Sequence, residues 1–197
     1  MKKVGRILLV LLCVLVIITG CGNKETGKTK QISLGSWTEN TYTNDFLGVT
    51  YNMPSDWTRY TDEEIKDVME LGSELTDASE LSKKLSELTS VTYMMTSNPT
   101  GTNVILMSEK PVVSVSEKTY AESLKTQLEN QTAMTYNLSE IKTETIDGKE
   151  FVTIEATVET LKQKYYIYKV DKYIVSVIIT ATANDNINTI VEQFEFK

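Results

Sequence analysis

Residues 141–179, IKTETIDGKEFVTIEATVETLKQKYYIYKVDKYIVSVII, decide the fold class of this chain. The stretch is rich in the β-branched and aromatic residues that strands favour. Asp147-Gly148 is a strong two-residue hairpin signal, and it separates strands expected at 140–146 and 149–158. The C-terminal half of the chain is therefore predicted to form antiparallel hairpins.

The second half of this stretch predicts a further hairpin with an aromatic strand. Asp171-Lys172 is the expected turn before an apolar strand at 173–179. Because successive side chains of a strand point to opposite faces, Tyr166 and Tyr168 share one face and Tyr165 lies on the other. One of these two sets is expected to be exposed or covered by a helix.

Working outward, the preceding sequence alternates strand and helix signals. Strand formers occupy residues 46–53 and end at Pro54. Two further strands are expected at 91–96 and 103–107, joined by a turn at 98–101. Because most connections are short turns, we predict an α+β domain: a largely antiparallel β-sheet with helices packed mainly on one face.

Helices are predicted from capping residues followed by apolar residues at helical spacing. The expected N-terminal caps are polar residues before such a pattern: Thr61, Asp77, Ser116 and Asn184. Thr61 and Glu64 match a capping box. Apolar residues from Ile187 to Phe194 follow the helical period, so the last helix is expected to end at Phe194-Glu195-Phe196.

Residues 1–20 have the pattern of a signal peptide. Three basic residues precede Ile7 to Ile18, an apolar run that spans about 18 Å as a helix, against a hydrocarbon core of about 30 Å. Ile18-Thr19-Gly20-Cys21 resembles the lipobox of bacterial lipoproteins. That resemblance implies cleavage between Gly20 and Cys21 and a diacylglyceryl group on the Cys21 sulfur. An ordinary secretory signal with a chance cysteine, or an uncleaved anchor, are the alternatives.

The rest of the chain is expected to consist of a tether and one domain. Residues 21–41 are assigned to the lipidated cysteine and a polar, flexible tether, and residues 42–197 to a single domain without internal repeats. Trp37 is the exception in the tether. It is interpreted as a loose linker residue, with packing on the domain or contact with the membrane interface as alternatives.

Charge and composition exclude several classes of function. The leader carries three of the 20 basic residues and no acid, so the remainder has 17 basic against 27 acidic side chains. A body this acidic is repelled by phosphate backbones, which argues against nucleic acid as a partner. The chain has no histidine, so the usual general base and the commonest zinc ligand are missing. We therefore expect no catalysis, no cofactor and no bound metal.

A family resemblance emerges from residues 44–57, NDFLGVTYNMPSDW, where a strand leads into a P-x-x-W turn. This segment resembles the opening of PsbP-like and DcrB-like domains, and the order of the later elements agrees over about residues 42–197. The chain is similar to small lipoproteins of Gram-positive bacteria. The resemblance implies a PsbP-like fold and a role in assembly or interaction, and it supplies no catalytic residue.

Two surfaces are candidates for binding near the first helix. Trp57 is expected to anchor the first strand to the core, with ligand stacking as the alternative. The run from Asp62 to Glu80 carries eight acids against one base. Solvated helix surface is the simplest interpretation, since acids favour helix N-termini, and calcium or a basic protein are the alternatives. The residues named for an interaction surface here are Trp57, Asp62, Glu63, Asp67 and Glu70.

The third candidate surface is the aromatic hairpin with Tyr166 and Tyr168. Core and cross-strand packing is the simplest interpretation, and an exposed interaction patch is the alternative.

Taken together, these features predict a lipid-anchored protein on the extracytoplasmic face of a cell membrane, in a Gram-positive bacterium. Its expected function is non-catalytic binding or assembly with another envelope protein of unknown identity. A lipoprotein that binds a small ligand or cation for uptake or sensing is one alternative. A carboxylate-based envelope enzyme, with two acids facing each other across a deep pocket, is the other.

Overall fold

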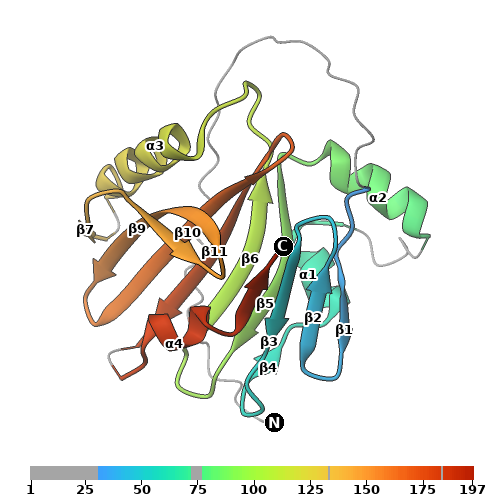
Figure 1. The fold of residues 1–197 in the computed structure, drawn as a ribbon, viewed down its shortest axis with the longest axis horizontal. Coiled ribbons are helices and arrows are strands. Elements are labelled where there is room, and N and C mark those ends of the chain that lie inside the picture. Colours follow the sequence, from blue (N-terminus) through green and yellow to red (C-terminus); the bar gives the residue numbers. More distant parts are fainter. Residues whose placement is uncertain (1–30, 72–76, 133, 183) are drawn as a thin grey trace.

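The computed structural model describes residues 31–71, 77–132, 134–182 and 184–197. These residues form two antiparallel β-sheets and four helices (Figure 1). The leader, the cleavage site between Gly20 and Cys21, and Cys21 itself lie outside the described residues.

The larger sheet contains eight strands in the order β4-β5-β6-β11-β10-β9-β7, with β8 also paired to β9. All of its ladders are antiparallel. Its strands are β4 (Thr58–Arg59), β5 (Ser90–Ser97), β6 (Asn103–Glu109), β7 (Asn137–Leu138), β8 (Lys142–Ile146), β9 (Lys149–Val158), β10 (Leu161–Val170) and β11 (Tyr173–Ala181). Asp147 and Gly148 have φ values of 49° and 77°, as the predicted hairpin turn requires.

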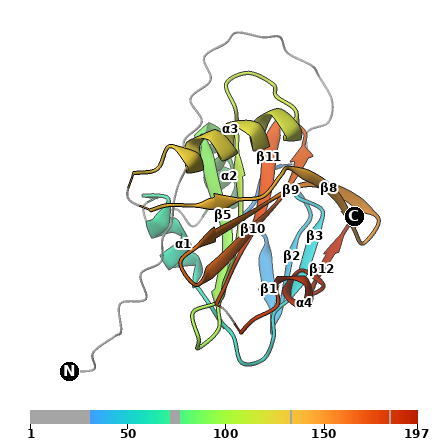
Figure 2. The ribbon, with the colours of Figure 1, turned by 90° about the vertical axis from the view of Figure 1, so that its left-hand side faces the viewer.

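The smaller sheet has four strands in the order β1-β2-β3-β12 and joins both ends of the described chain. Its strands are β1 (Ser36–Thr38), β2 (Thr41–Asn44), β3 (Val49–Asn52) and β12 (Phe194–Phe196). Figure 2 shows this sheet lying beside the larger one. Buried side chains of both sheets belong to one core cluster. The strand predicted at 46–53 is β3, and it begins three residues later than predicted. The Asn44 side chain accepts a hydrogen bond from the Leu47 amide at 3.1 Å, which holds the chain before β3 in a turn.

The helices are α1 (Asp62–Val68), α2 (Ala78–Glu87), α3 (Glu117–Glu129) and α4 (Ile187–Val191). The predicted caps of the first three, Thr61, Asp77 and Ser116, are confirmed, and the capping box at Thr61 is complete. The prediction for the last helix is wrong at both ends. Asn186 rather than Asn184 caps it, and the chain leaves the helix before Phe194 because Phe194–Phe196 pairs with β3.

The inner core lies between the two sheets and is dominated by rings. It includes Tyr51, Phe151, Tyr166, Tyr168 and Phe194, each no more than 2% exposed. Several of these rings meet edge to face, as with Phe151 and Phe196, whose centroids are 4.7 Å apart. Large flat side chains fill the gap between two stacked sheets.

The helix-covered core lies on the opposite face of the larger sheet. Ile65 of α1 and four residues of α3 pack here on alternate residues of the strands. The α3 residues are those predicted at helical spacing: Tyr120, Ala121, Leu124 and Leu128. The α+β, antiparallel prediction is confirmed, while the second sheet, which covers the other face together with α2 and α4, was not predicted from the sequence.

The folded domain begins earlier than the sequence predicted. Residues 36–38 form β1, paired with β2, and Ile32 is buried in the inner core. Trp37 is half-buried and its ring lies 5.3 Å from that of Tyr42. The expected boundary at residue 42 and the interpretation of Trp37 as a loose linker residue are therefore corrected, because backbone pairing with β2 outweighs the polar local sequence.

Candidate functional site

The tyrosines of the aromatic hairpin are buried, so they cannot form an interaction surface. Tyr166 and Tyr168 are 1% and 2% exposed, on the face opposite Tyr165 as alternation predicted. Neither set is exposed, and the set with Tyr166 and Tyr168 is covered by the smaller sheet rather than by a helix. Their assignment to an interaction surface is therefore wrong, and core packing is the correct interpretation.

The predicted acidic surface is present on α1 and at Glu70, just after the helix. Asp62, Glu63, Asp67 and Glu70 are all exposed, and none of them forms an ion pair with another described residue. Glu64 accepts the Thr61 amide at 2.8 Å and so belongs to the capping box. Within the described part of the chain, no group of three or more acidic side chains is placed to hold a metal ion. Among the described residues, these four acids therefore form a negatively charged surface without ion pairs.

Trp57 lies five residues before α1 and is half-buried against the inner core. Anchoring to the core, the simplest interpretation of Trp57, is confirmed. Trp57 immediately precedes β4, and the guanidinium of Arg59 in that strand lies 4.9 Å from the centroid of the Trp37 ring. Arg59 Nη1 also donates to the Glu39 carbonyl at 3.4 Å, which joins the two sheets at one open side.

We call this side the β1/β4 edge, defined by Trp37, Trp57 and Arg59 together with the exposed acids of α1. Trp37 and Arg59 were missed from the sequence as site residues. Their rarity was the available signal: Trp37 and Trp57 are the two tryptophans of the chain, and Arg59 is its one arginine outside the leader. β1 and β4 are each the outermost strand of their sheet. The edge therefore combines unpaired strand backbone, aromatic side chains and charge.

A buried lysine forms a second polar cluster, at the end of the inner face. Lys164 is 5% exposed, and its ammonium lies 2.9 Å from a Glu144 oxygen and 3.1 Å from Glu155 Oε1. The same ammonium lies 5.0 Å from the centroid of the Tyr166 ring. The Tyr166 hydroxyl is the one buried side-chain polar atom of the described residues that has no hydrogen-bond partner.

Ion pairing sets the protonation states in this cluster. Partial burial alone would raise the pKa of Glu144, but hydrogen bonds from Lys164 and Thr153 outweigh it and lower the pKa below 4.5. Burial alone would lower the pKa of Lys164, but its contact with Glu144 raises it. Glu144 is therefore held ionised and cannot serve as the neutral acid that two-carboxylate hydrolysis needs.

Glu109 has the opposite environment, beneath α3. Burial raises its pKa from 4.5 to about 7, and the facing Tyr120 hydroxyl only partly offsets this effect. Both side chains belong to the helix-covered face and are nearly inaccessible, at 8% and 4% exposed. A carboxyl group with a pKa near neutrality is thus present, but it faces the underside of a helix.

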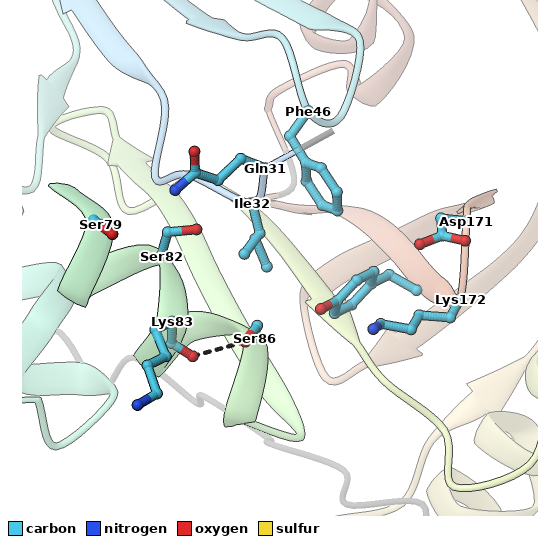
Figure 3. Close-up of a pocket in the computed structure, with 10 residues that line it drawn as sticks. Gln31, Ile32, Phe46, Ser79, Ser82, Lys83, Ser86, Asp171 and Lys172 are labelled. Atoms are coloured by element: carbon cyan, nitrogen blue, oxygen red, sulfur yellow. Dashed lines mark hydrogen bonds between the residues drawn. The ribbon is translucent and has the colours of Figure 1, made fainter. Parts of the chain in front are cut away.

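An open cavity of about 370 Å³ lies between α2, the chain at Gln31-Ile32 and the turn between β10 and β11 (Figure 3). Serine hydroxyls of α2 line one wall, and Phe46 and Tyr173 line the other. A second open groove, of about 450 Å³, runs beside Lys164 and the start of α4.

No described helix has the length and apolarity to cross a bilayer.

Comparison with known proteins supports the fold. No protein-family model matches the chain, and no curated protein matches its sequence. Among solved structures, the solution structure of CyanoP, the cyanobacterial PsbP of Synechocystis sp. PCC 6803, matches with a TM-score of 0.51 and 10% sequence identity. The match covers 83% of this chain and 99% of CyanoP. The fold of this chain is therefore PsbP-like, as the resemblance of residues 44–57 implied.

Proposed function

We propose that this chain is a bacterial lipoprotein, anchored by lipid on Cys21 outside a Gram-positive cell membrane, that binds an envelope protein without catalysis. The observation that carries the proposal is the β1/β4 edge. Tryptophan and arginine are, with tyrosine, the residue types most enriched in the hot spots of protein interfaces. Here Arg59 of β4 lies over the Trp37 ring of β1, which joins the outermost strands of the two sheets, and Trp57 immediately precedes β4.

The charge of this edge favours a basic partner. Asp62, Glu63, Asp67 and Glu70 are exposed without an ion pair to a described residue, and they follow Arg59 closely in sequence. Complementary charge accelerates encounter and excludes acidic partners. A partner with a basic surface and an apolar contact for Trp37 and Trp57 fits this composition.

The anchor rests on the sequence pattern of residues 1–21, with its basic start, short apolar run and lipobox. Two acyl chains hold a protein at a membrane where a single chain binds only marginally. Ten peptide units separate Cys21 from Gln31, which keeps Gln31 within about 35 Å of the lipidated residue. The PsbP-like domain would then act close to the membrane surface.

Site-specific photocrosslinking tests the binding surface in the full-length, membrane-bound protein. A photoreactive residue at Thr38, which is exposed on β1, is expected to give one discrete adduct. The double variant Asp62→Lys, Asp67→Lys should weaken that adduct, because it reverses the charge beside the edge. The matched control is Glu122→Lys, Glu129→Lys, two exposed acids of α3. Equal adducts in both double variants, or no adduct in the wild type, would contradict the proposed surface.

Mass spectrometry of the native protein tests the anchor separately. A mature N-terminus at Cys21 carrying a diacylglyceryl mass is expected, together with loss of the modification in Cys21→Ala. An intact leader or an unmodified thiol would contradict the anchor while leaving the binding surface to its own test.

A further inference from the structure

We propose that the cavity between α2 and the β10–β11 turn binds a small amphiphilic anion, with an apolar body and a phosphate or carboxylate head group. The cavity measures about 370 Å³, a size typical of small-ligand sites. Three segments distant in sequence line it: the chain at Gln31-Ile32 with Phe46, helix α2, and residues 171–173. The lining shares no residue with the β1/β4 edge.

The floor of the cavity is apolar and fixed. Ile32, Phe46 and Tyr173 are between 3% and 5% exposed. The Phe46 and Tyr173 rings meet edge to face with centroids 5.4 Å apart, and Figure 3 shows Phe46 and Ile32 directed toward the same space. Side chains held in this way offer a preformed apolar surface to the body of a ligand.

Hydroxyl groups line the wall above this floor. Ser79, Ser82 and Ser86 of α2 line the cavity, and in Figure 3 the Ser82 hydroxyl points into it. Ser86 Oγ donates its hydrogen to the Lys83 carbonyl at 2.7 Å, so donation to an anionic head group falls to the Ser79 and Ser82 hydroxyls. Ser82 is only 8% exposed, and its hydroxyl is therefore sheltered from bulk water.

Lys172 gives the cavity its charge preference. Its ammonium lies 5.6 Å from the centroid of the Tyr173 ring and forms no ion pair with a described residue. In Figure 3, Asp171 lies on the outer side of the cavity and the Lys83 ammonium points away from it. A single ammonium beside hydroxyl donors favours an anionic head group over a neutral or cationic one.

Two sources could supply this chemistry: a membrane phospholipid or a soluble amphiphile. The probe for the shared chemistry is octyl phosphate, compared with octanol, which lacks the charge. The protein is residues 22–197, which include every described residue and carry no acyl chain. Binding is followed by NMR shifts of backbone amides, with residues 78–87 and 171–173 as the site and α3 as the internal control.

Octyl phosphate is expected to shift the amides of α2 and of residues 171–173 and to bind more tightly than octanol. Lys172→Gln should weaken octyl phosphate binding about tenfold, the equivalent of one lost charge-assisted hydrogen bond, and leave octanol binding unchanged. Lys84→Gln, on the same helix but outside the cavity lining, should change neither. Ser82→Leu should fill the cavity and abolish binding of both probes.

Flotation with vesicles distinguishes the sources. Binding to phosphatidylcholine vesicles that contain phosphatidylglycerol, lost in Lys172→Gln, would identify a lipid head group. Binding of octyl phosphate without binding to vesicles would identify a soluble amphiphile. The inference is overturned if octyl phosphate causes no shifts at millimolar concentration, if the shifts lie on α3, or if Lys172→Gln binds as well as the wild type.

Discussion

The two faces of the larger sheet are made by the same strands, yet they are built differently. The inner face carries Phe151, Tyr166 and Tyr168, and the smaller sheet covers it. The helix-covered face carries mainly aliphatic residues such as Ile154 and Ile167, with α3 lying across them. Alternation assigns residues to a face, but the covering element determines which side chains fill it.

The covering elements differ in sequence distance. Helix α3 lies about twenty residues before β9, whereas β3 and β12, which cover the inner face, stand at opposite ends of the described chain. Rings suit the gap between stacked sheets because they are large and rigid, and edge-to-face contacts add to their burial. Packing on the inner face therefore brings together β3 and β12, which are far apart in sequence and pair with each other.

The two faces also shift the pKa of a carboxyl group in opposite directions. On the inner face Glu144 is paired with Lys164 and its pKa is lowered, while on the helix-covered face burial raises the pKa of Glu109 to about 7. At neutral pH the ionised Glu144 carboxylate therefore stabilises the fold, whereas ionisation of Glu109 destabilises it. The following predictions use this contrast, beginning with the largest expected effect.

Phe151→Ala is expected to lower the free energy of unfolding by about 3–5 kcal/mol, because it leaves a cavity in the inner core. Leu128→Ala, an equally buried position on α3, should cost about 1 kcal/mol less, since no ring contacts are lost there. Urea unfolding of both variants measures the difference. An equal or larger loss for Leu128→Ala would refute the special role of rings between the sheets.

Glu109→Gln is expected to stabilise the protein by about 2 kcal/mol above pH 7, because it removes a buried charge. The folded-state pKa is raised above 4.5, so folding takes up a proton and wild-type stability falls as pH rises from 4.5 through about 7. The variant should lack this fall. Urea midpoints across that range test the prediction, with exposed Glu122→Gln as the control, and a fall of the same size in Glu109→Gln would contradict it.

Glu144→Gln should have the opposite sign. Its folded-state pKa lies below 4.5, so the carboxylate stabilises the protein at neutral pH and that contribution is lost as pH falls below 4.5. We expect a loss of no more than about 1 kcal/mol at neutral pH, because solvent screens the partly exposed carboxylate. Chemical unfolding at neutral pH and again in acid checks this, and a loss that persists in acid would show that ion pairing is not its cause.

The smallest expected effect concerns two neighbouring hydroxyls. The Tyr165 hydroxyl bonds the Gln163 side chain, whereas the Tyr166 hydroxyl is buried without a hydrogen-bond partner. Tyr166→Phe should therefore change stability by less than about 0.5 kcal/mol, while Tyr165→Phe should cost about 1 kcal/mol. Thermal melting of the pair is sufficient, and a costlier Tyr166→Phe would reveal a hydrogen bond to that hydroxyl in solution.

Local patterns in the sequence were sufficient for most single elements. Thr61, Asp77 and Ser116 cap helices because a cap depends on only a few adjacent residues. Asp147-Gly148 forms the turn between β8 and β9 because its positive φ values match hairpin twist. Antiparallel pairing and the face of each tyrosine followed from those turns and from alternation.

Only the tertiary structure decided the smaller sheet, the helical limit near Phe194 and the contact between Trp37 and Arg59. The sequence around each favours something else: polar tether around Trp37, and helical spacing through Phe194. What overrides it is backbone pairing between segments far apart, as between Phe194 and Tyr51. Such pairing is set by the closure of the whole chain around its inner core, and no local window of sequence contains that information.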